Sequence, residues 1–410
     1  MFKKIKDFNV NNKTVFLRAD MNVSIKNGKI IDDTRIKATI PTIEYLVNNG
    51  AKVVLASHLG KASGNGFQEE FSLKIVLERL KELLPNVKFN YSKDCIGEET
   101  KKDVKNTNFG EVVLLENLRF HTGEEGNDPE FAKELASLAD IYVNDAFSTC
   151  HRKHASMVGI PAILDSYAGI NLEYELDNLS ALVSDPERPV MVIVGGSKVS
   201  TKLELLKALV SKTDYVVVGG GMANTFLFAN GVNVGKSLKE EELKNDALDL
   251  LEKAKANNCE VILPVDVVVA KEVAENQSVV TKSLNELTDN DIIVDVGEKT
   301  IELIQNRLGK CKVVIWNGPI GIYEIKPFNK GTDALAGIIA DITSKGEIKS
   351  VAGGGDILAA LNNASIADKF TYLSTAGGSF LKWLEKGILP AVEKLKNNYF
   401  NNKYSLLIRF

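Results

Sequence analysis

The feature that most constrains the fold of this chain is the alternation of continuous apolar runs with segments of helical periodicity. The runs are rich in Val, Ile and Leu, and most are apolar at consecutive positions rather than at every second one. Such runs are typical of parallel strands that helices bury on both faces. With helical segments such as 71–84, 129–139 and 202–210 between them, they predict a doubly wound α/β fold. The expected strands lie at residues 14–19, 51–57, 111–118, 140–146, 189–196, 214–221, 259–270, 311–318 and 350–356.

The length of the chain favours two domains. Its 410 residues, 44% of them hydrophobic, are too many for one core and enough for two. Residues 171–189 are predicted to form a long amphipathic helix that ends at Pro186 and Pro189, and we expect it to connect the two halves. The segment after about residue 396 matches no strong pattern.

Charge, hydropathy and cysteine use narrow the class of protein. The net charge of −4, with both signs interspersed, argues against nucleic acid as the main ligand. No apolar run reaches transmembrane length, and the N-terminus MFKKIKDFNV lacks the apolar stretch of a signal peptide. Cys95, Cys150, Cys259 and Cys311 form no CxxC pair and no Cys/His group with zinc-site spacing. We therefore expect a soluble cytosolic protein with free thiols.

Arginine is scarce and unevenly distributed. There are eight arginines against 42 lysines, and five of the eight precede residue 155, as do all four histidines. Because lysine serves for ordinary surface charge, arginine is expected where its planar fork binds phosphate or carboxylate. Arg79, inside a helical segment, is instead predicted to be a surface charge. The other arginines and the histidines of the first half are Arg18, Arg35, Arg119, Arg152, His58, His121, His151 and His154.

Polar and basic groups follow four expected strands of the first half, and each group carries Arg or His. In an open parallel sheet, ligands sit at the carboxyl ends of the strands. Any one group could be ordinary caps and turns, but four together predict a cationic pocket for a small, strongly anionic ligand. A metal site made by His151 and His154 is an alternative. A Ser/His/Asp triad is poorly supported, because nothing resembles a nucleophile elbow.

Glycine-rich turns follow the expected strands of the second half. Glycine lets the backbone approach a ligand closely, and N–H groups at helix starts bind phosphate. Five such turns predict a cradle for the phosphates of a nucleotide, near Lys198 and Lys202. There Asp356 could hold Mg²⁺ and Glu324 could accept from ribose hydroxyls. The turns are Gly195-Gly196, Gly219-Gly220-Gly221, Asn317-Gly318-Pro319, Gly353-Gly354-Gly355-Asp356 and Ser374-Thr375-Ala376-Gly377-Gly378.

An anion pocket and a nucleotide cradle on separate domains predict phosphoryl transfer between two ligands, with closure of the domains to exclude water. A dinucleotide-dependent oxidoreductase is a rival interpretation, but it needs a GxGxxG fingerprint that the chain lacks, as it also lacks a Walker loop. A protein that binds such ligands without turnover is a second alternative.

Eight motifs, in this order, resemble those of phosphoglycerate kinase: RADMN, SHLGK, ENLRFH, VNDAFSTCHRKHAS, GGSKVSTK, WNGPIGIYE, GGGD and STAGG. The resemblance runs from about residue 14 to about residue 393. It implies reversible phosphoryl transfer between 1,3-bisphosphoglycerate and ADP, giving 3-phosphoglycerate and ATP, with Mg²⁺. The family's nucleophile is a carboxylate, ionised far above its pKa of about 3.5, so no general base is required.

The resemblance also implies an organisation. It implies a monomer of two Rossmann-like, doubly wound parallel-sheet domains joined by a helical hinge near residues 171–185. Residues 1–170 would bind phosphoglycerate, with the tail of about 391–410 packed back on them. Residues 171–390 would comprise the hinge helix and the nucleotide-binding domain. A paralogue of the same family that binds ligand with impaired catalysis is the alternative.

Carried over by motif, the family's site falls on particular residues of this chain. Arg35 and Lys198 would hold the migrating phosphoryl group, together with the N–H groups of Gly377 and Gly378. Asp356 would bind Mg²⁺ and Glu324 the ribose. Phosphoglycerate would be held by Asp20, Met21, Asn22, Arg35, His58, Leu59, Gly60, Lys61, Arg119 and Arg152. The nucleotide phosphates would be held by Lys202, Asn317, Gly353, Gly354, Gly355, Ser374 and Thr375.

Several positions depart from the family's pattern. The family has Asp where this chain has Thr201 and Arg where it has Lys61, which keeps the charge and loses the fork. The other departures are Ile293, Glu298, Ile357 and Ala376, where the family has Gly, Pro, Thr and Gly. We expect Ile293 to narrow the adenine pocket and Ile357 to remove a hydroxyl beside the metal site. Activity is expected to persist, because the main cations stay in place, with altered nucleotide preference or weaker binding.

Overall fold

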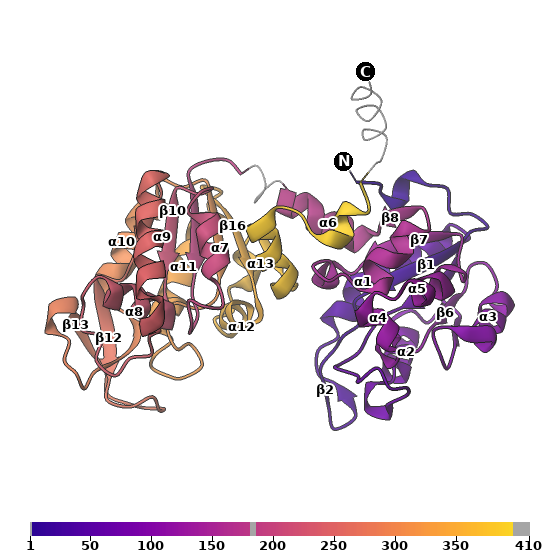
Figure 1. Cartoon of the computed structure of the whole chain (residues 1–410), viewed down its shortest axis with the longest axis horizontal. Helices are drawn as coiled ribbons and strands as arrows, with labels where there is room; N and C mark the ends of the chain where they lie inside the picture. Colours follow the sequence, from indigo (N-terminus) through magenta and orange to yellow (C-terminus); the bar gives the residue numbers. More distant parts are fainter. Residues whose placement is uncertain (1, 181–185, 397–410) are drawn as a thin grey trace, which may run out of the picture. The chain divides into compact units, whose positions relative to one another are not determined.

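The computed structural model describes residues 2–180 and 186–396, and it divides into two compact units (Figure 1). The first unit comprises residues up to 177 and those from 388 on, and the second comprises residues 178–387. Helix α6, Ile170–Leu179, crosses this division, and the remainder of the predicted connecting helix falls partly on 181–185, outside the described residues. The assignment of one ligand to each unit stays a prediction.

The first unit is built on a six-stranded parallel sheet in the order β5-β6-β4-β1-β7-β8. Its strands are β1 Thr14–Ala19, β4 Lys52–Ala56, β5 Phe89–Tyr91, β6 Val112–Leu114, β7 Ile141–Asp145 and β8 Ser166–Ala168. Its helices are α1 Thr34–Asn48, α2 Lys74–Leu83, α3 Gly97–Asn106, α4 Thr122–Gly126 and α5 Pro129–Ala136. A short hairpin, β2 Ile25–Lys26 and β3 Lys29–Ile30, precedes α1.

Strand β1 shows why its sequence is continuously apolar. Val15 and Leu17 pack into one hydrophobic cluster, and Phe16, on the other face of the strand, packs into a second. Both faces of the sheet are therefore buried, which is what a parallel sheet covered by helices requires. Arg18 shares the face of Phe16 and is also fully buried, so its guanidinium must find partners inside the protein.

Residues 2–3 and residues 395–396 meet on the first unit. Lys3 N–H donates to Leu395 O at 3.0 Å, and Phe2 forms an isolated bridge with Lys396. Leu395 follows helix α14, Pro390–Glu393, and is fully buried. The described end of the predicted tail therefore packs against the first unit, while its residues 397–410 lie outside the described residues.

The second unit has a parallel sheet of the same kind and a smaller antiparallel one. The parallel order is β11-β10-β9-β15-β16-β17, and the antiparallel order is β13-β12-β14. The strands are β9 Val190–Val194, β10 Tyr215–Val218, β11 Glu260–Ile262, β12 Asp266–Ala270, β13 Val280–Ser283, β14 Ile292–Val296, β15 Val313–Asn317, β16 Lys349–Gly353 and β17 Tyr372–Ser374. The helices are α7 Leu203–Leu209, α8 Gly220–Ala229, α9 Lys244–Ala256, α10 Glu298–Leu308, α11 Lys330–Ser344, α12 Gly355–Asn363 and α13 Gly377–Lys386.

One predicted strand was wrong. The run 259–270 is two strands, β11 in the parallel sheet and β12 in the antiparallel sheet. They are separated at Pro264, which has no N–H to donate to a ladder. Strand β12 then pairs with β14 by antiparallel bonds, with a register shift between Val268 and Val269. This small sheet carries one wall of the cavity described below.

Both parallel sheets are fully covered on their central strands. All residues of β9 and β15 are buried, as are those of β6 and β7. No helix within the described residues is long and apolar enough to cross a bilayer. The functional residues must therefore be sought at the carboxyl ends of the strands, where the chain leaves each buried sheet.

Candidate active site

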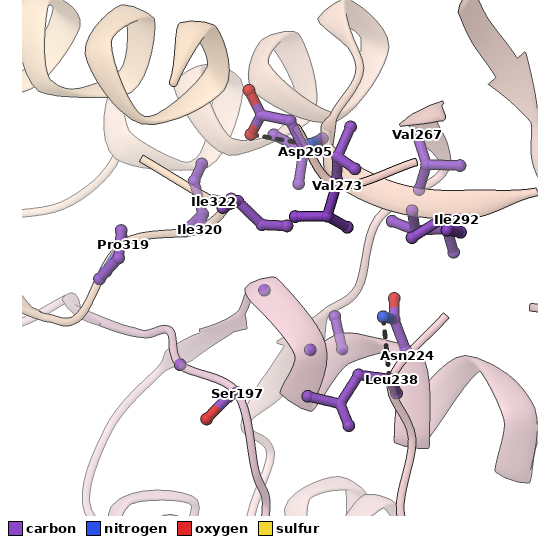
Figure 2. Close-up of a pocket in the computed structure, with 18 of the residues that line it drawn as sticks. Ser197, Asn224, Leu238, Val267, Val273, Ile292, Asp295, Pro319, Ile320 and Ile322 are labelled. Atoms are coloured by element: carbon purple, nitrogen blue, oxygen red, sulfur yellow. Dashed lines mark hydrogen bonds between the residues drawn. The ribbon is translucent and has the colours of Figure 1, made fainter. Parts of the chain in front are cut away.

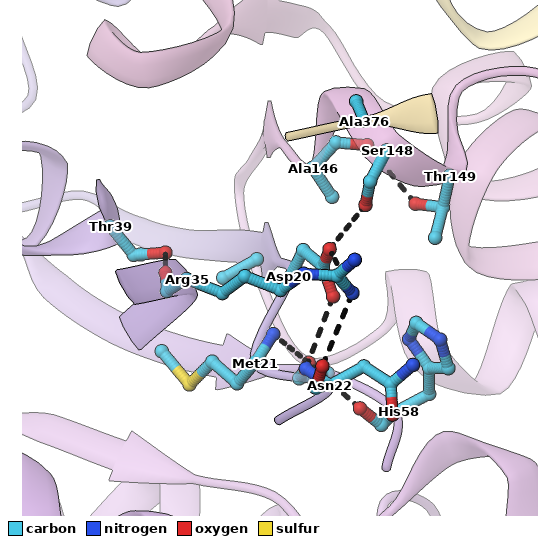
Figure 3. Close-up of polar contacts among 12 residues, drawn as sticks. Asp20, Met21, Asn22, Arg35, Thr39, His58, Ala146, Ser148, Thr149 and Ala376 are labelled. Carbon is cyan, nitrogen blue, oxygen red and sulfur yellow. Dashed lines mark hydrogen bonds and ion pairs between the residues drawn. The ribbon is translucent and has the colours of Figure 1, made fainter. Parts of the chain in front are cut away.

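In the first unit, the predicted anion-binding residues follow the carboxyl ends of adjacent strands. Asp20, Met21 and Asn22 follow β1, and His58 follows its neighbour β4 two residues after the strand ends. Arg119 lies in the 3₁₀ turn Leu118–Phe120, soon after β6. Figure 3 shows the polar contacts that join part of this set.

Arg35 is anchored by the loop after β1. It lies in the first turn of α1, and its Nη1 is 3.0 Å from Asp20 Oδ2 and donates to Asn22 O at 3.1 Å (Figure 3). Asp20 also accepts a hydrogen bond from the hydroxyl of Ser148. The Arg35 side chain remains 35% exposed, and no contact within the described residues uses its Nε or Nη2. A fixed guanidinium with donors to spare suits an anion that arrives from solvent.

The turn after β4 is locked to the turn after β1. Met21 N–H donates to Ser57 Oγ at 2.9 Å, and Gly60 N–H donates to Asn22 Oδ1 at 2.8 Å. Gly60 has φ +65°, and a Cβ there would lie 2.3 Å from the ring of Phe71, so only glycine fits. Leu59 O accepts from Asn117 Nδ2 at 2.8 Å, which ties the same turn to the segment that follows β6. The two loops thus form one rigid unit.

His58 is buried and its proton is placed by Arg18. Arg18 Nη2 lies 3.2 Å from His58 Nδ1. Since arginine can only donate, Nδ1 must be the acceptor, and the ring proton sits on Nε2. Burial, and then the charges of Arg18 and Arg119, hold the pKa of His58 well below its usual value. His58 is therefore a neutral imidazole with one N–H to offer an anion.

Arg18 is itself held by a buried relay. Its Nε donates to Ser156 Oγ at 3.0 Å, and Ser156 Oγ donates to Glu124 Oε1 at 2.5 Å. Glu124 is fully buried and also accepts from Ser156 N–H at 2.9 Å. The sequence singles out Arg18 among the arginines expected to bind an anion, but no sequence pattern indicates Glu124. The signal that could have found the role of Arg18 is an arginine inside a strand that is apolar on both faces.

Two arginines share one carboxylate. Arg119 Nε lies 3.0 Å from Glu125 Oε1, and Arg152 Nη1 lies 3.9 Å from the same oxygen. Arg119 Nη1 donates to Gly60 O at 2.8 Å, whereas its buried Nη2 has no hydrogen-bond partner among the described residues. Burial lowers the pKa of Arg119. A buried donor without a partner is costly, so this guanidinium is the clearest sign of an anion site in the unit. Lys61, by contrast, is exposed and contributes no contact to the group among the described residues.

The second unit contains a cavity of about 590 Å³. Figure 2 shows its mostly apolar walls, which include Leu238, Val273 and Ile292. Glu324, Asp356 and Ile293 all line it. Lys236, Leu238 and Val273 also line the cavity, and no sequence pattern points to them. A cavity with apolar sides and a few acidic groups at the rim suits a planar base with a sugar attached.

Beside this cavity, three strand ends are fastened together by Lys202 and Asn317. Lys202 Nζ donates to Gly195 O and to Asn317 Oδ1, both at 2.6 Å, and Asn317 Nδ2 donates to Gly353 O. Burial lowers the pKa of Lys202 to about 8, against the attraction of Asp356. A desolvated ammonium at the ends of β9, β15 and β16 is a strong site for a phosphate oxygen.

Two helices begin side by side at this point. Gly353 pairs with Ser374 across β16 and β17, and a Cβ on Gly377 would lie 3.4 Å from the Cα of Gly354. Helix α12 begins at Gly355 and α13 at Gly377, so the first-turn N–H groups of both, including those of Gly378, lie close together. Gly354 has φ +115°, a conformation that other residues rarely adopt. Ser374 is buried and Thr375 is exposed.

Lys198 is exposed in the turn between β9 and α7. Its carbonyl accepts from Thr201 Oγ1 at 2.8 Å, so the turn is held from within. The alternative of a metal site from His151 and His154 finds no support. Neither belongs to a group of three potential metal ligands within residues 2–180 and 186–396. Instead, His154 Nδ1 lies 3.7 Å from Oε1 of the buried Glu124.

Comparison with known proteins gives a consistent result. A family model described as phosphoglycerate kinase matches residues 5–387. A phosphoglycerate kinase of Xanthobacter flavus is 49% identical over 384 residues, which cover 94% of this chain and 96% of that protein. One of Rhodospirillum centenum is 47% identical over 394 residues, covering 96% and 99%.

Solved structures agree. The phosphoglycerate kinase of Coxiella burnetii matches with a TM-score of 0.89 at 41% identity, covering 96% of this chain and 99% of that one. The enzyme of Pyrococcus horikoshii OT3 matches with a TM-score of 0.79 at 32% identity, covering 96% and 98%.

Proposed function

The chain belongs to the phosphoglycerate kinase family, and from this premise we propose how its residues divide the work of the reaction. The enzyme transfers a phosphoryl group reversibly between 1,3-bisphosphoglycerate and ADP, giving 3-phosphoglycerate and ATP. In our proposal the first unit holds the phosphoglycerate and the second holds the nucleotide. No observation favours a chain that binds these ligands without turnover.

The phosphoglycerate is held by the basic residues of the first unit. Arg119 and Arg152 offer guanidinium donors, and the buried Nη2 of Arg119 supports this role because it has no hydrogen-bond partner of its own. His58 donates from Nε2, since Arg18 occupies its other nitrogen. Asp20, Asn22 and the turn from Leu59 to Lys61 orient the substrate, with Met21 fixing the loop through its N–H.

The nucleotide is held by the cavity and the glycine turns of the second unit. The base lies between the apolar walls, with Glu324 toward the ribose. Lys202, Asn317 and the N–H groups around Gly353, Gly354 and Gly355 receive the phosphates, with Ser374 and Thr375 at the neighbouring turn. Asp356 fits a Mg²⁺ site, because an exposed carboxylate beside phosphate oxygens is the usual way in which proteins hold this ion. The ion would neutralise phosphate charge as the bond to the leaving oxygen breaks.

In the direction of ATP use, a carboxylate oxygen of 3-phosphoglycerate attacks the γ-phosphorus. A new O–P bond forms, the bond to the β-phosphate oxygen breaks, and ADP leaves with the electron pair. Charge spreads over the three oxygens of the migrating group, and fixed donors stabilise it. We assign this role to Arg35, Lys198 and the helix-start N–H groups of Gly377 and Gly378.

The reaction requires both ligands to meet away from water. We propose that the chain bends in the connection that α6 begins, so that the ligands are brought together. A monomer in the cytoplasm fits this picture, because each predicted ligand site is complete within one chain.

The single observation that carries the proposal is the Lys202–Asn317 fastening of three strand ends beside a base-sized cavity. The test is a coupled assay of the full chain with 3-phosphoglycerate and either ATP or GTP, with Mg²⁺ or with chelator. We expect ADP-forming turnover that needs both 3-phosphoglycerate and Mg²⁺. A purified, folded chain without such turnover would refute the assignment.

Lys198→Ala separates catalysis from binding. Lys198 is exposed, so its loss should leave the thermal midpoint unchanged while turnover falls sharply. Lys207→Ala is the control, because Lys207 is a lysine of the same unit that pairs with Glu204 at 3.1 Å on α7. Equal effects of the two changes on turnover would remove Lys198 from the site.

A further inference from the structure

We propose that Asp94, Cys95 and His121 of the first unit form a binding site for a Zn²⁺ ion. One potential ligand atom from each residue lies within 4.8 Å of the other two. Among residues 2–180 and 186–396, this is the one such group of three His, Cys, Asp or Glu side chains. Sequence spacing gave no hint of it, because His121 is 26 positions after Cys95 and joins the pair only in the fold.

The three ligand atoms lie close enough together for one ion to contact all of them after a small adjustment. His121 Nε2 lies 2.6 Å from Asp94 Oδ1, and the Cys95 thiol is in reach of the same carboxylate. Ligands on one Zn²⁺, with Zn–N and Zn–O bonds of about 2.0–2.1 Å and Zn–S of about 2.3 Å, lie about 3.3–3.6 Å apart. The Asp94–His121 hydrogen bond must therefore open by less than about 1 Å for the ion to replace the proton between them.

The ligand set selects the kind of ion. Thiolate, imidazole and carboxylate together suit borderline-soft Zn²⁺, whereas Mg²⁺ and Ca²⁺ prefer all-oxygen sites. Three protein ligands leave the fourth tetrahedral position for water. On binding, the Cys95 S–H bond is exchanged for an S–Zn bond and the proton leaves to solvent, with no change in oxidation state.

Exposure provides an entry path. The side chains of Asp94 and His121 are 52% and 29% exposed, while Cys95 is fully buried beneath them. The ion can therefore arrive from solvent on the outer two ligands and engage the thiol behind them. The His121 ring already packs against Phe131, with ring centroids 5.3 Å apart, so its orientation is fixed before the ion arrives.

The position of the group suggests what the ion does. Cys95 stands just before α3, and His121 lies between the turn of Arg119 and helix α4. A bound Zn²⁺ would join these two segments, which the Asp94–His121 pair already links. We expect binding to stabilise the folded first unit, because the unfolded chain does not present the three ligands together.

The test uses the full-length, metal-stripped enzyme and two ions. Co²⁺ reports its ligands directly, so we expect a thiolate-to-cobalt charge-transfer absorption that saturates at one ion per chain. Zn²⁺ titrated against a chromogenic chelator should bind with the same stoichiometry and raise the thermal midpoint.

Variants identify the ligands. Cys95→Ser should abolish the cobalt absorption and weaken Zn²⁺ by more than about 100-fold, because loss of a supporting hydrogen bond alone costs about 10–100-fold. His121→Gln should weaken Zn²⁺ in the same sense. The control is Cys259→Ser, since Cys259 is also a buried free cysteine but lies outside any such group within the described residues.

The proposal is overturned if the unaltered enzyme gives no thiolate-to-cobalt absorption, a result that needs no variant to fold. It is equally overturned if Cys95→Ser and His121→Gln both keep tight binding of one Zn²⁺, which would place the ion elsewhere on the chain.

Discussion

The two units prepare for an anion by opposite means. In the first unit the positive charge is on side chains that the protein's own carboxylates already hold, as Asp20 holds Arg35 and Glu125 holds Arg119. In the second unit most donors are backbone N–H groups at glycine turns, and one half-buried lysine, Lys202, supplies the charge. The first site should therefore be sensitive to loss of charge, and the second to any added Cβ.

The two sites also differ in what keeps their binding groups in position before the ligand arrives. An arginine paired with a carboxylate keeps its position in the empty site, so the ligand meets a rigid surface. A glycine turn keeps its position through backbone conformation and neighbouring amides, such as Asn317 beneath Gly354. Each strategy suits its ligand: a small acid offers few atoms to contact, whereas a nucleotide offers a chain of phosphates that the backbone can follow.

The largest expected effect comes from removing a charge in the first unit. Arg35→Ala should lower kcat by about 10²–10³, the usual cost of losing a donor aimed at transition-state charge. Single-turnover measurements should show the loss in the chemical step, with 3-phosphoglycerate affinity changed less. Unchanged kinetics would show that Arg35 serves only the structure of the loop.

Arg79→Ala is the matched control for this change. Arg79 lies in the same unit, but Nε and Nη2 both donate to Asp33 Oδ2, at 2.9 and 2.6 Å, and Nη1 contacts Glu82. All three guanidinium nitrogens of Arg79 thus contact carboxylates of the same unit. This arrangement agrees with the prediction that Arg79 is a surface charge. The variant should keep its kcat and lose at most a little stability.

A Cβ in the second unit should have the next largest effect. In Gly354→Ala the methyl group would lie 2.7 Å from Asn317 Nδ2, at φ +115°. Strain of about 1–3 kcal/mol corresponds to a fall in ADP affinity of about fivefold to 150-fold, measured by calorimetry. Gly337→Ala, in helix α11 with open space around it, should leave ADP affinity unchanged. Equal affinities would mean that this turn does not hold phosphate.

How far the sequence could predict this molecule depends on the range of the interactions involved. Strand β1 was predicted to the residue, because burial on both faces is written in consecutive apolar positions. The three-residue strands β5, β8 and β17 are too short to give a pattern. The run 259–270 resembles one strand because both of its halves are apolar. Within this run, Pro264 is the one residue that indicates the break.

For the site, residues next to strand ends could be found and their partners could not. Arg35 and Lys202 stand in recognisable motifs. The relay from Arg18 through Ser156 to Glu124 joins three separate segments, so no local pattern reveals it. The same holds for Val273 and Leu238, which reach the cavity from loops. Side-chain contacts between distant segments are set by packing, which a single sequence does not display.

A third prediction concerns the pH dependence of the second site. The pKa of Lys202 is about 8, below its ordinary 10.5, because burial disfavours the charged form. As pH rises through about 8 the ammonium is lost, so ADP affinity should fall, by up to about tenfold per pH unit above that value. Calorimetry between about pH 6.5 and about pH 9.5 would measure it. In Lys202→Met the slope should vanish, and in Lys207→Met it should remain.

The lowered pKa of Lys202 also affects the stability of the fold. This effect increases stability as pH rises, whereas ADP affinity should fall. Between about 8 and 10.5 the unfolded chain binds the Lys202 proton and the folded chain does not. The contribution of this lysine to the free energy of unfolding therefore increases with pH over that window. Lys202→Met should remove this contribution, and an unchanged pH dependence of stability in that variant would mean that Lys202 keeps its ordinary pKa in the folded chain.

The smallest expected effect tests the apolar wall of the second site. Ile293 lines the cavity where the family has glycine, and its N–H donates to Ser237 Oγ at 2.8 Å, so the backbone should stay in place when the side chain is cut. Ile293→Ala should widen the space for the base and shift the ratio of KM values for GTP and ATP by roughly threefold to tenfold in favour of GTP. Leu284→Ala matches it for stability, because Leu284 packs against the same small cluster but does not line the cavity. That control should leave the ratio unchanged. If Ile293→Ala also left the ratio of KM values unchanged, base preference would depend on backbone atoms alone. The second site would then differ from the first even more, because its choice of base would not involve this side chain.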